Sequence, residues 1–296
     1  MVLLFIIALL FASCTNSNSP TPENHEKNLN AASLNITVFL DLSDRIDTLK
    51  YPGKPQQYQK DISDIACIVD VFKQKLEHKK IYDLNDKLRV LFHPLPVDDS
   101  IATIASRLSI DLAGQDRTEI LEIYHNIDEL FLSNCDQLYS IVRNYSGQQE
   151  RFPGSNIWRF IKDNRDQFVN DDTTFRNILF IITDGYMYYD TDHLQDGKRY
   201  NFIERESSHL KRFRDPQQLE TNFEKDDYGF IPVQQDLSNL EIYVIEVSPD
   251  QAYPRDYDIL KRYWEKWFDE MNVKKYRFIE SNLPSITQRR IVTLME

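Results

Sequence analysis

The stretch LNITVFLDLSDR, residues 34–45, decides how the rest of the sequence is interpreted. Its first half is a run of apolar and β-branched residues, the pattern of a strand that is buried on both faces in a parallel sheet. Asp41, Ser43 and Asp44 follow at the carboxyl end of that strand, where open α/β sheets place their ligand sites. The stretch therefore predicts a central strand that ends in a polar site.

A second apolar run has the same composition and the same ending. Residues 177–183, NILFIIT, also read as a buried strand, and Asp184 and Gly185 follow directly. Neighbouring parallel strands bring their carboxyl ends to one edge of a sheet. We therefore expect the two strands to lie side by side and Asp41 and Asp184 to converge on one site.

Elsewhere the apolar pattern alternates between helical and strand periodicity, which predicts a doubly wound, mostly parallel α/β sheet flanked by helices. Residues 185–239 break this pattern, with one helical fragment near residues 202–213. Such a long excursion between two core strands is typically functional or mobile. The expected helices cover about residues 58–76, 118–144, 155–168, 257–271 and 284–294, and the further strands cover residues 87–93, 107–112, 240–247 and 275–279.

Length and charge bound the class of protein. A chain of 296 residues can bury one large core, or a core with an inserted subdomain, and 41% hydrophobic with 28% charged residues is an ordinary soluble composition. The formal net charge of −12 argues against a general nucleic-acid binder, whose affinity would come from a basic face. We therefore expect no nucleic-acid partner.

The first 14 residues resemble the export signal of a bacterial lipoprotein. Residues 2–12 are apolar but too few to span a bilayer, and Ser13 and Cys14 follow. Two small residues before a Cys resemble the lipobox, which implies that Cys14 carries the lipid anchor. Residues 15–33 have the polar, Pro-containing composition of a flexible tether. We expect residues 34–296 to be the folded domain of an exported envelope lipoprotein, in the periplasm or on the outer surface, although a plain signal peptide with an incidental Cys remains the alternative.

Other distinctive residues have structural interpretations. Cys67 and Cys135 occupy apolar positions of helical patterns and are expected as small buried hydrophobes, with a disulfide left open. Trp264 and Trp267 are expected in the core. The basic cluster at residues 211–214 is expected on a solvated helix face, with a docking patch for an acidic partner as the alternative.

Three loops, taken in order, resemble the von Willebrand factor A family, including its integrin-type inserted domains. They are residues 41–45 (DLSDR), residues 154–157 (GSNI) at a helix start, and residues 183–185 (TDG). In that family Asp-x-Ser-x-Ser, Gly-Thr-Asn-Ile-like and Thr-Asp-Gly loops form a metal-ion-dependent adhesion site. The resemblance covers about residues 34–279, and it implies the fold of that family.

The resemblance implies a metal site at four residues. Asp41 and Ser43 match the first two positions of the first loop, Ser155 stands for the Thr of the second, and Asp184 matches the Asp of the third. The hydroxyls would bind Mg²⁺ or another divalent cation directly, and the carboxylates would act largely through water. Because Mg²⁺ takes oxygen ligands and keeps several waters, one position stays available for a partner's carboxylate.

Arg45 departs from the family pattern, because it stands where the second metal-binding Ser is expected. A guanidinium cannot coordinate a cation. Arg45 either points away, leaving Asp44 or water to complete the site, or folds inward and pairs with Asp41 and Asp184 as a built-in replacement for the metal. Clustered carboxylates need a compensating positive charge, and we favour the inward arrangement.

These features together predict a membrane-anchored lipoprotein that binds a protein partner, through an acidic side chain of that partner or through residues 185–239. We assign no catalytic residue. One alternative is a metal-assisted hydrolase that uses Asp41, Asp44 and Asp184, although no His that could act as a general base neighbours these loops in the sequence. The other alternative is a structural lipoprotein whose site has decayed.

Overall fold

The computed structural model describes residues 32–296 except 96–98, 149–151 and 251. The expected signal peptide at residues 1–14, its Cys14, and the tether up to residue 31 lie outside the described residues. The first strand begins at Ser33, one residue before the expected domain boundary. Within the described part of the chain, no helix is both long and apolar enough to cross a membrane.

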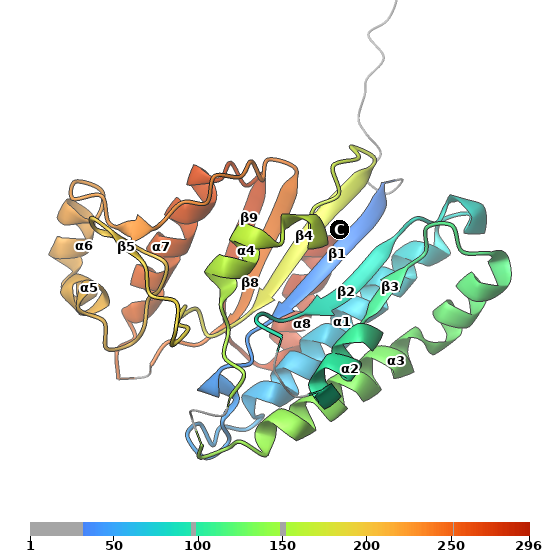
Figure 1. Ribbon diagram of the computed structural model, residues 1–296, viewed down its shortest axis with the longest axis horizontal. Coiled ribbons are helices and arrows are strands. Elements are labelled where there is room, and N and C mark those ends of the chain that lie inside the picture. The colour runs from blue at the N-terminus through green and yellow to red at the C-terminus, as the bar shows by residue number, and fades with distance from the viewer. Residues whose placement is uncertain (1–31, 96–98, 149–151, 251) are drawn as a thin grey trace, which may run out of the picture.

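A six-stranded, mostly parallel sheet forms the centre of the molecule, which confirms the predicted fold class (Figure 1). Its order is β3-β2-β1-β4-β8-β9, with β3 antiparallel to β2 and the other described pairs parallel. The predicted neighbours β1 and β4 are paired in register from Ser33 to Leu40. The strands are β1 (Ser33–Leu40), β2 (Lys87–Leu91), β3 (Ser109–Asp111), β4 (Phe175–Ile182), β8 (Leu240–Val247) and β9 (Lys275–Glu280).

The strand β1 is buried on both faces, because each face of the sheet supports its own core. Ile36 and Val38 belong to the hydrophobic cluster on one side of the sheet, and Phe39 belongs to the cluster on the other side. Alternate side chains of a strand point to opposite faces, and Phe39 shares its face with the buried Asn35 and Thr37, which donate to backbone carbonyls at residues 168 and 167. Burial of each apolar side chain contributes roughly 1.5–3 kcal/mol to stability.

Four helices cover the first face: α1 (Gln57–Glu77), α2 (Asp99–Arg107), α3 (Arg117–Arg143) and α8 (Pro284–Met295). The sequence did not predict α2, because it buries only two apolar residues. The strand expected at residues 107–112 follows this helix. The observed strand β3 is three residues long. Asp116 caps α3 by accepting from the backbone N–H of Thr118 at 2.7 Å and of Glu119 at 2.9 Å. Cys67 on α1 and Cys135 on α3 are both free.

The second face carries α4 (Ile157–Asp163), α7 (Asp256–Glu270) and the excursion. Trp264 and Trp267 of α7 are fully buried, as expected. The helix α4 ends at Asp163, before the expected residue 168, and a short 3-10 turn follows.

Residues 185–239 fold into a lobe beside α7, visible at the left of Figure 1. Phe230 holds the lobe in place, because its ring lies 5.4 Å from the rings of Tyr263 and Trp267. The expected helical fragment begins at Ser208 rather than near residue 202. The elements of the lobe are β5 (Gln195–Asp196), β6 (Arg199–Tyr200), α5 (Ser208–Lys211), α6 (Pro216–Asn222) and β7 (Gly229–Phe230).

The order of the strands determines where a site can form. From β1 the chain crosses to β2 through α1 on one face, whereas from β4 it crosses to β8 through the excursion on the other face. The two connections diverge at the carboxyl ends of β1 and β4. Such a switch point leaves a crevice in which doubly wound proteins bind their ligands.

Candidate functional site

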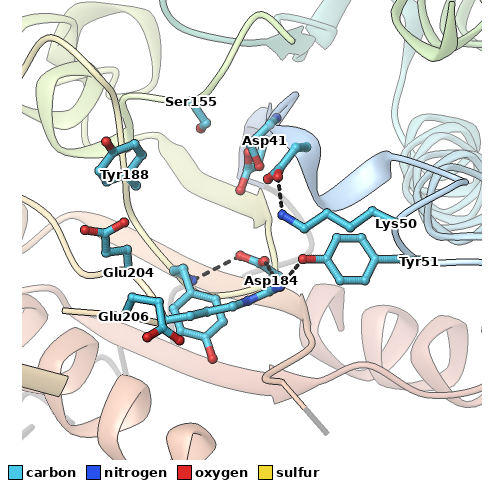
Figure 2. A pocket seen from close by; sticks show the side chains of 12 residues that line it. Asp41, Lys50, Tyr51, Ser155, Asp184, Tyr188, Glu204 and Glu206 are labelled. Atoms are coloured by element: carbon cyan, nitrogen blue, oxygen red, sulfur yellow. Dashed lines mark hydrogen bonds and ion pairs between the residues drawn. The ribbon is translucent and has the colours of Figure 1, made fainter. Parts of the chain in front are cut away.

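A cleft of about 310 Å³ opens at the carboxyl ends of β1 and β4 (Figure 2). It brings together all four predicted site residues, namely Asp41, Ser43, Ser155 and Asp184. The two loops that follow the apolar strands therefore converge, as their positions in the sequence predicted. The remaining lining side chains are Asp44, Lys50, Tyr51, Tyr186, Tyr188, Glu204, Arg205 and Glu206.

Asp41 is held rigidly at the floor of the cleft. It is 2% exposed, and its Oδ1 accepts the backbone N–H of Ser43 at 3.0 Å, the local turn that an Asp at a strand end favours. Its Oδ2 accepts the hydroxyl of Thr183 at 2.6 Å. Both carboxylate oxygens therefore have donors from the two loops that meet here.

Asp184 lies beside Asp41 and shares its electrostatic environment. Its Oδ1 accepts the backbone N–H of Tyr186, and its Oδ2 accepts a guanidinium N–H of Arg205, both at 3.1 Å. Burial and the neighbouring Asp41 carboxylate raise the pKa of Asp184, against the opposing charge of Arg45. Two carboxylates this close favour a positive charge in the cleft.

Ser155 contributes a hydroxyl that has no hydrogen-bond partner among the described residues. The residue is only 3% exposed, and its side chain lines the same cleft as Asp41 and Asp184. Gly154 positions it with a φ of +76° and a backbone bridge to Leu42. A buried polar group without a partner costs about 1–3 kcal/mol, so this hydroxyl is suited to bind a ligand.

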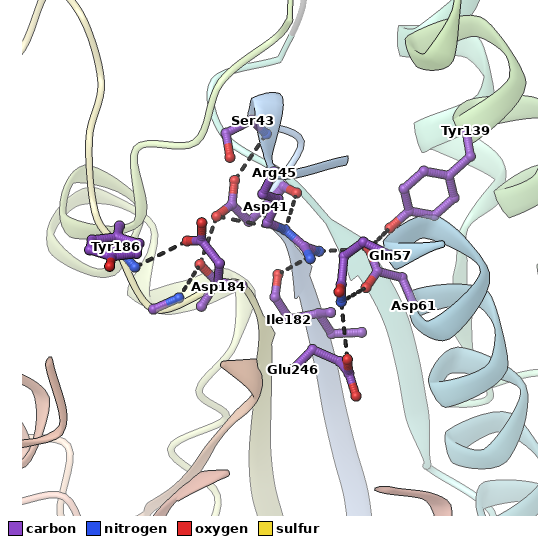
Figure 3. Close-up of polar contacts among 12 residues, drawn as sticks. Asp41, Ser43, Arg45, Gln57, Asp61, Tyr139, Ile182, Asp184, Tyr186 and Glu246 are labelled. Atoms are coloured by element: carbon purple, nitrogen blue, oxygen red, sulfur yellow. Dashed lines mark hydrogen bonds and ion pairs between the residues drawn. The ribbon is translucent and has the colours of Figure 1, made fainter. Parts of the chain in front are cut away.

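Arg45 points inward, as expected, but its main partner is not the predicted one (Figure 3). Its guanidinium donates to Asp61 on α1 at 2.6 Å, and its Nε donates to the backbone carbonyl of Asp41 at 2.9 Å. The carboxylate of Asp41 lies 3.8 Å from Nε. The expected ion pair with Asp184 is not formed, because Arg205 binds that carboxylate instead.

The Arg45–Asp61 pair is part of a buried network that the sequence pattern did not reveal. Asp61 also accepts the Tyr139 hydroxyl at 2.7 Å and the Gln57 amide at 3.2 Å. Burial raises the pKa of Asp61, whereas the charge of Arg45 acts in the opposite direction. Burial also opposes the charge of Arg45, but Asp61 and Asp41 outweigh it and raise the pKa of that guanidinium.

Arg205, like Asp61, is a charged residue of the site that the sequence pattern did not predict. Its guanidinium carbon lies 4.9 Å from the ring centre of Tyr51 and 5.0 Å from that of Tyr186. It also donates to the Tyr51 hydroxyl. Nothing in the local sequence pattern marks Arg205, because it reaches the cleft only when the excursion folds back over the strand ends.

The rim holds a further ion pair between Asp44 and Lys50, whose side-chain atoms approach to 2.5 Å. Both side chains are partly exposed, and such surface pairs contribute about 0–1 kcal/mol. Asp44 is the third carboxylate of the hydrolase alternative, which stays a prediction.

Within the described ranges, no group of three or more His, Cys, Asp or Glu side chains is arranged to hold a metal ion. The candidate donor set here is of another kind, since half of its side chains are hydroxyls. Comparisons with protein-family models, curated proteins and solved structures found no match to this chain. The resemblance to the von Willebrand factor A family therefore rests on the three loops.

Proposed function

We propose that this chain is an exported, membrane-anchored lipoprotein whose von Willebrand factor A-like domain binds a protein partner at the cleft. A divalent cation such as Mg²⁺ would be held by Asp41, Ser43, Ser155 and Asp184. The observation that carries this proposal is the buried hydroxyl of Ser155, which has no partner in the described part of the chain and lines one cleft with the carboxylates of Asp41 and Asp184.

The chemistry of the donor set fits a hard cation. Ser43 and Ser155 supply hydroxyl oxygens, and Asp41 and Asp184 supply negative charge. Asp41 already accepts two hydrogen bonds, so it would act largely through its charge and through water. When bound, the cation would provide a Lewis-acidic position for an acidic side chain of the partner.

Arg45 is compatible with this proposal. Its guanidinium is directed to Asp61 and does not line the cleft, so it leaves the space beside Ser43 and Ser155 to a ligand. The site then has one hydroxyl fewer than the family pattern. Because Mg²⁺ commonly keeps several waters, this loss does not exclude binding.

The rim of the cleft is mixed in charge, and the bound cation would make it suit an acidic partner. Lys50 and Arg205 place two positive charges beside the carboxylates, whereas Glu204 and Glu206 add negative charge, and Tyr188 adds an aromatic surface that is 37% exposed. Complementary charge at a rim mainly raises the rate of association and the specificity. We therefore expect recognition to involve both the cation position and the excursion.

The experiment measures Mg²⁺ binding by titration calorimetry, and then capture of envelope proteins with Mg²⁺ or with chelator. The wild type should bind Mg²⁺, and Ser155→Ala should weaken binding on the order of 10–100-fold. Ser285→Ala removes a hydroxyl from an exposed position outside the cleft and serves as the matched control. Equal Mg²⁺ affinity in wild type and Ser155→Ala would contradict the assignment, and partner capture that ignores chelation would contradict the role of the cation.

A further inference from the structure

Two cavities meet at the side chain of Arg205. The cleft and a second cavity of about 570 Å³ are both lined by Lys50, Tyr51, Asp184 and Arg205. The second cavity continues to residues 248–250 after β8 and to the first turns of α1. Arg205 and its neighbours therefore form a wall between two parts of one surface depression.

The side chain of Arg205 is held by contacts that can be exchanged. It makes one ion pair to Asp184 at 3.1 Å, it donates to the Tyr51 hydroxyl, and it lies over the rings of Tyr51 and Tyr186. Its side chain is still 23% exposed. Cation–π contacts are individually weak, and a cation bound at Asp184 would replace the charge that the guanidinium supplies there, so a change of rotamer can release the guanidinium.

The backbone of Arg205 is fixed independently of its side chain. Its carbonyl accepts a hydrogen bond from Arg214 at 3.0 Å, and Arg214 also donates twice to Asp256 at the start of α7, each time at 2.9 Å. Two residues earlier, the backbone N–H of Ile203 donates to Met187 at 2.6 Å. The side chain can therefore leave Asp184 without unfolding the lobe. Arg214 of the basic cluster is also turned inward rather than presented on a solvated face.

We infer that Arg205 competes with the cation for Asp184: the guanidinium neutralises this carboxylate in the free protein, and cation binding releases it and joins the two cavities into one groove. This inference rests on the proposed function. One oxygen of Asp184 accepts from Tyr186 and the other from Arg205, and a guanidinium and a divalent cation at one carboxylate repel each other. By linkage, each weakens the binding of the other by the same factor.

The joined groove would run from Ser155 to residues 248–250, and the released guanidinium would face it together with Lys60. The released guanidinium, together with the Lys60 ammonium that lies 3.7 Å from Glu246, would give this elongated groove positive charge for an extended acidic segment of the partner. Cation binding would therefore both complete the adhesion site and expose the surface beside it.

The test compares Mg²⁺ affinity, by titration calorimetry, among the wild type, Arg205→Gln and Arg205→Ala. The Gln variant keeps a polar side chain of similar length, and Ala removes the group completely. Both should bind Mg²⁺ at least about tenfold more tightly than the wild type, within the range usual for coupled sites. Arg212→Ala removes the same charge from the excursion at a residue that lines neither cavity, and it should leave the affinity unchanged. Thermal melts without Mg²⁺ verify that each variant is folded.

A second readout follows the guanidinium itself. The NMR signal of the Arg205 Nε–H, assigned by its loss in Arg205→Gln, should shift when Mg²⁺ is added to the wild type, whereas the Arg214 signal should not. Equal Mg²⁺ affinity in the wild type and Arg205→Gln would overturn the competition and leave the cation site standing. Absence of Mg²⁺ binding in the wild type and in both Arg205 variants would overturn the competition together with the proposed cation site.

Discussion

Arg45→Ala tests which carboxylate the buried guanidinium of Arg45 neutralises. Arg45 is 3% exposed and contacts Asp61 at 2.6 Å, whereas the carboxylate of Asp41 is 3.8 Å away. The substitution leaves Asp61 fully buried, with only the neutral donors Tyr139 and Gln57. Removing one partner of a buried ion pair destabilises a protein by about 3–5 kcal/mol.

A second estimate of the same cost comes from protonation. In the variant, Asp61 can become neutral instead of remaining an unpaired charge. At pH 7 this costs about 4 kcal/mol, because a carboxyl of ordinary pKa near 3.9 must be held protonated and each pKa unit corresponds to about 1.36 kcal/mol. Both routes lead to a loss of about 3–5 kcal/mol at pH 7.

The pH dependence follows from the same reasoning. Without Arg45 the pKa of Asp61, already raised by burial, rises further. The folded variant then binds a proton that the unfolded chain releases, so its stability grows as the pH falls from 7 toward the ordinary carboxyl value. The deficit relative to the wild type should therefore shrink at pH 5.

Urea unfolding of four proteins at pH 7 and pH 5 measures these effects. Arg45→Ala combined with Asp61→Asn should regain most of the lost stability, because no buried charge remains. Arg289→Ala, at an exposed arginine, is the control and should change little. Mg²⁺ should not rescue Arg45→Ala, since Asp61 does not line the cleft. A loss below about 1 kcal/mol, the range of a surface pair, or full rescue by Mg²⁺, would refute the assignment of Arg45 to Asp61.

Three further predictions address other parts of the molecule. Asp64 is buried, neither of its carboxyl oxygens has a partner among the described residues, and burial raises its pKa to about 9. The folded state thus keeps a proton that the unfolded state releases above its ordinary pKa, and stability falls as the pH rises from about 4 to 9. Asp64→Asn should remove much of this dependence in calorimetric melts, and an unchanged pH profile would speak against it. Gly185→Ala should destabilise the protein by about 1–3 kcal/mol, because its φ is +95° and an added Cβ would lie 3.0 Å from a side chain of β8. The control is Gly197→Ala, at a φ of +59° with nothing within 4 Å of the added Cβ, which should cost less stability in the same urea assay. Cys14→Ser should move the protein from the membrane to the soluble fraction of cells, and unchanged fractionation would contradict lipidation at Cys14.

The local pattern of the sequence was enough to place the site. Residues 38–40 and 178–182 are apolar on successive positions, a pattern typical of a strand that is covered on both faces. Each run is followed directly by polar residues, so the order of residues alone assigns Asp41 and Asp184 to one edge of the sheet. The short helix α2 escaped prediction because two buried apolar residues make too weak a periodic signal.

The partners of the charged side chains could not be predicted from the local pattern of apolar residues. Apolar periodicity reports whether a position is buried, but it says nothing about which distant side chain faces it. Asp61 looks like an ordinary polar residue of a helix, and Arg205 lies in a segment without periodicity. Asp61 gains its role from Arg45, which precedes it by 16 residues in the sequence, and Arg205 gains its role from Asp184, which precedes it by 21 residues.

The sequence by itself therefore determined the doubly wound sheet and the edge at which its polar residues gather, because burial on both faces and the shared carboxyl edge of parallel strands follow from local order. The tertiary structure alone decided which positively charged side chain neutralises each carboxylate. Arg45 serves Asp61 and Arg205 serves Asp184, since the choice depends on how α1 and the excursion pack over the strand ends, where a few ångströms decide between competing partners of equal charge.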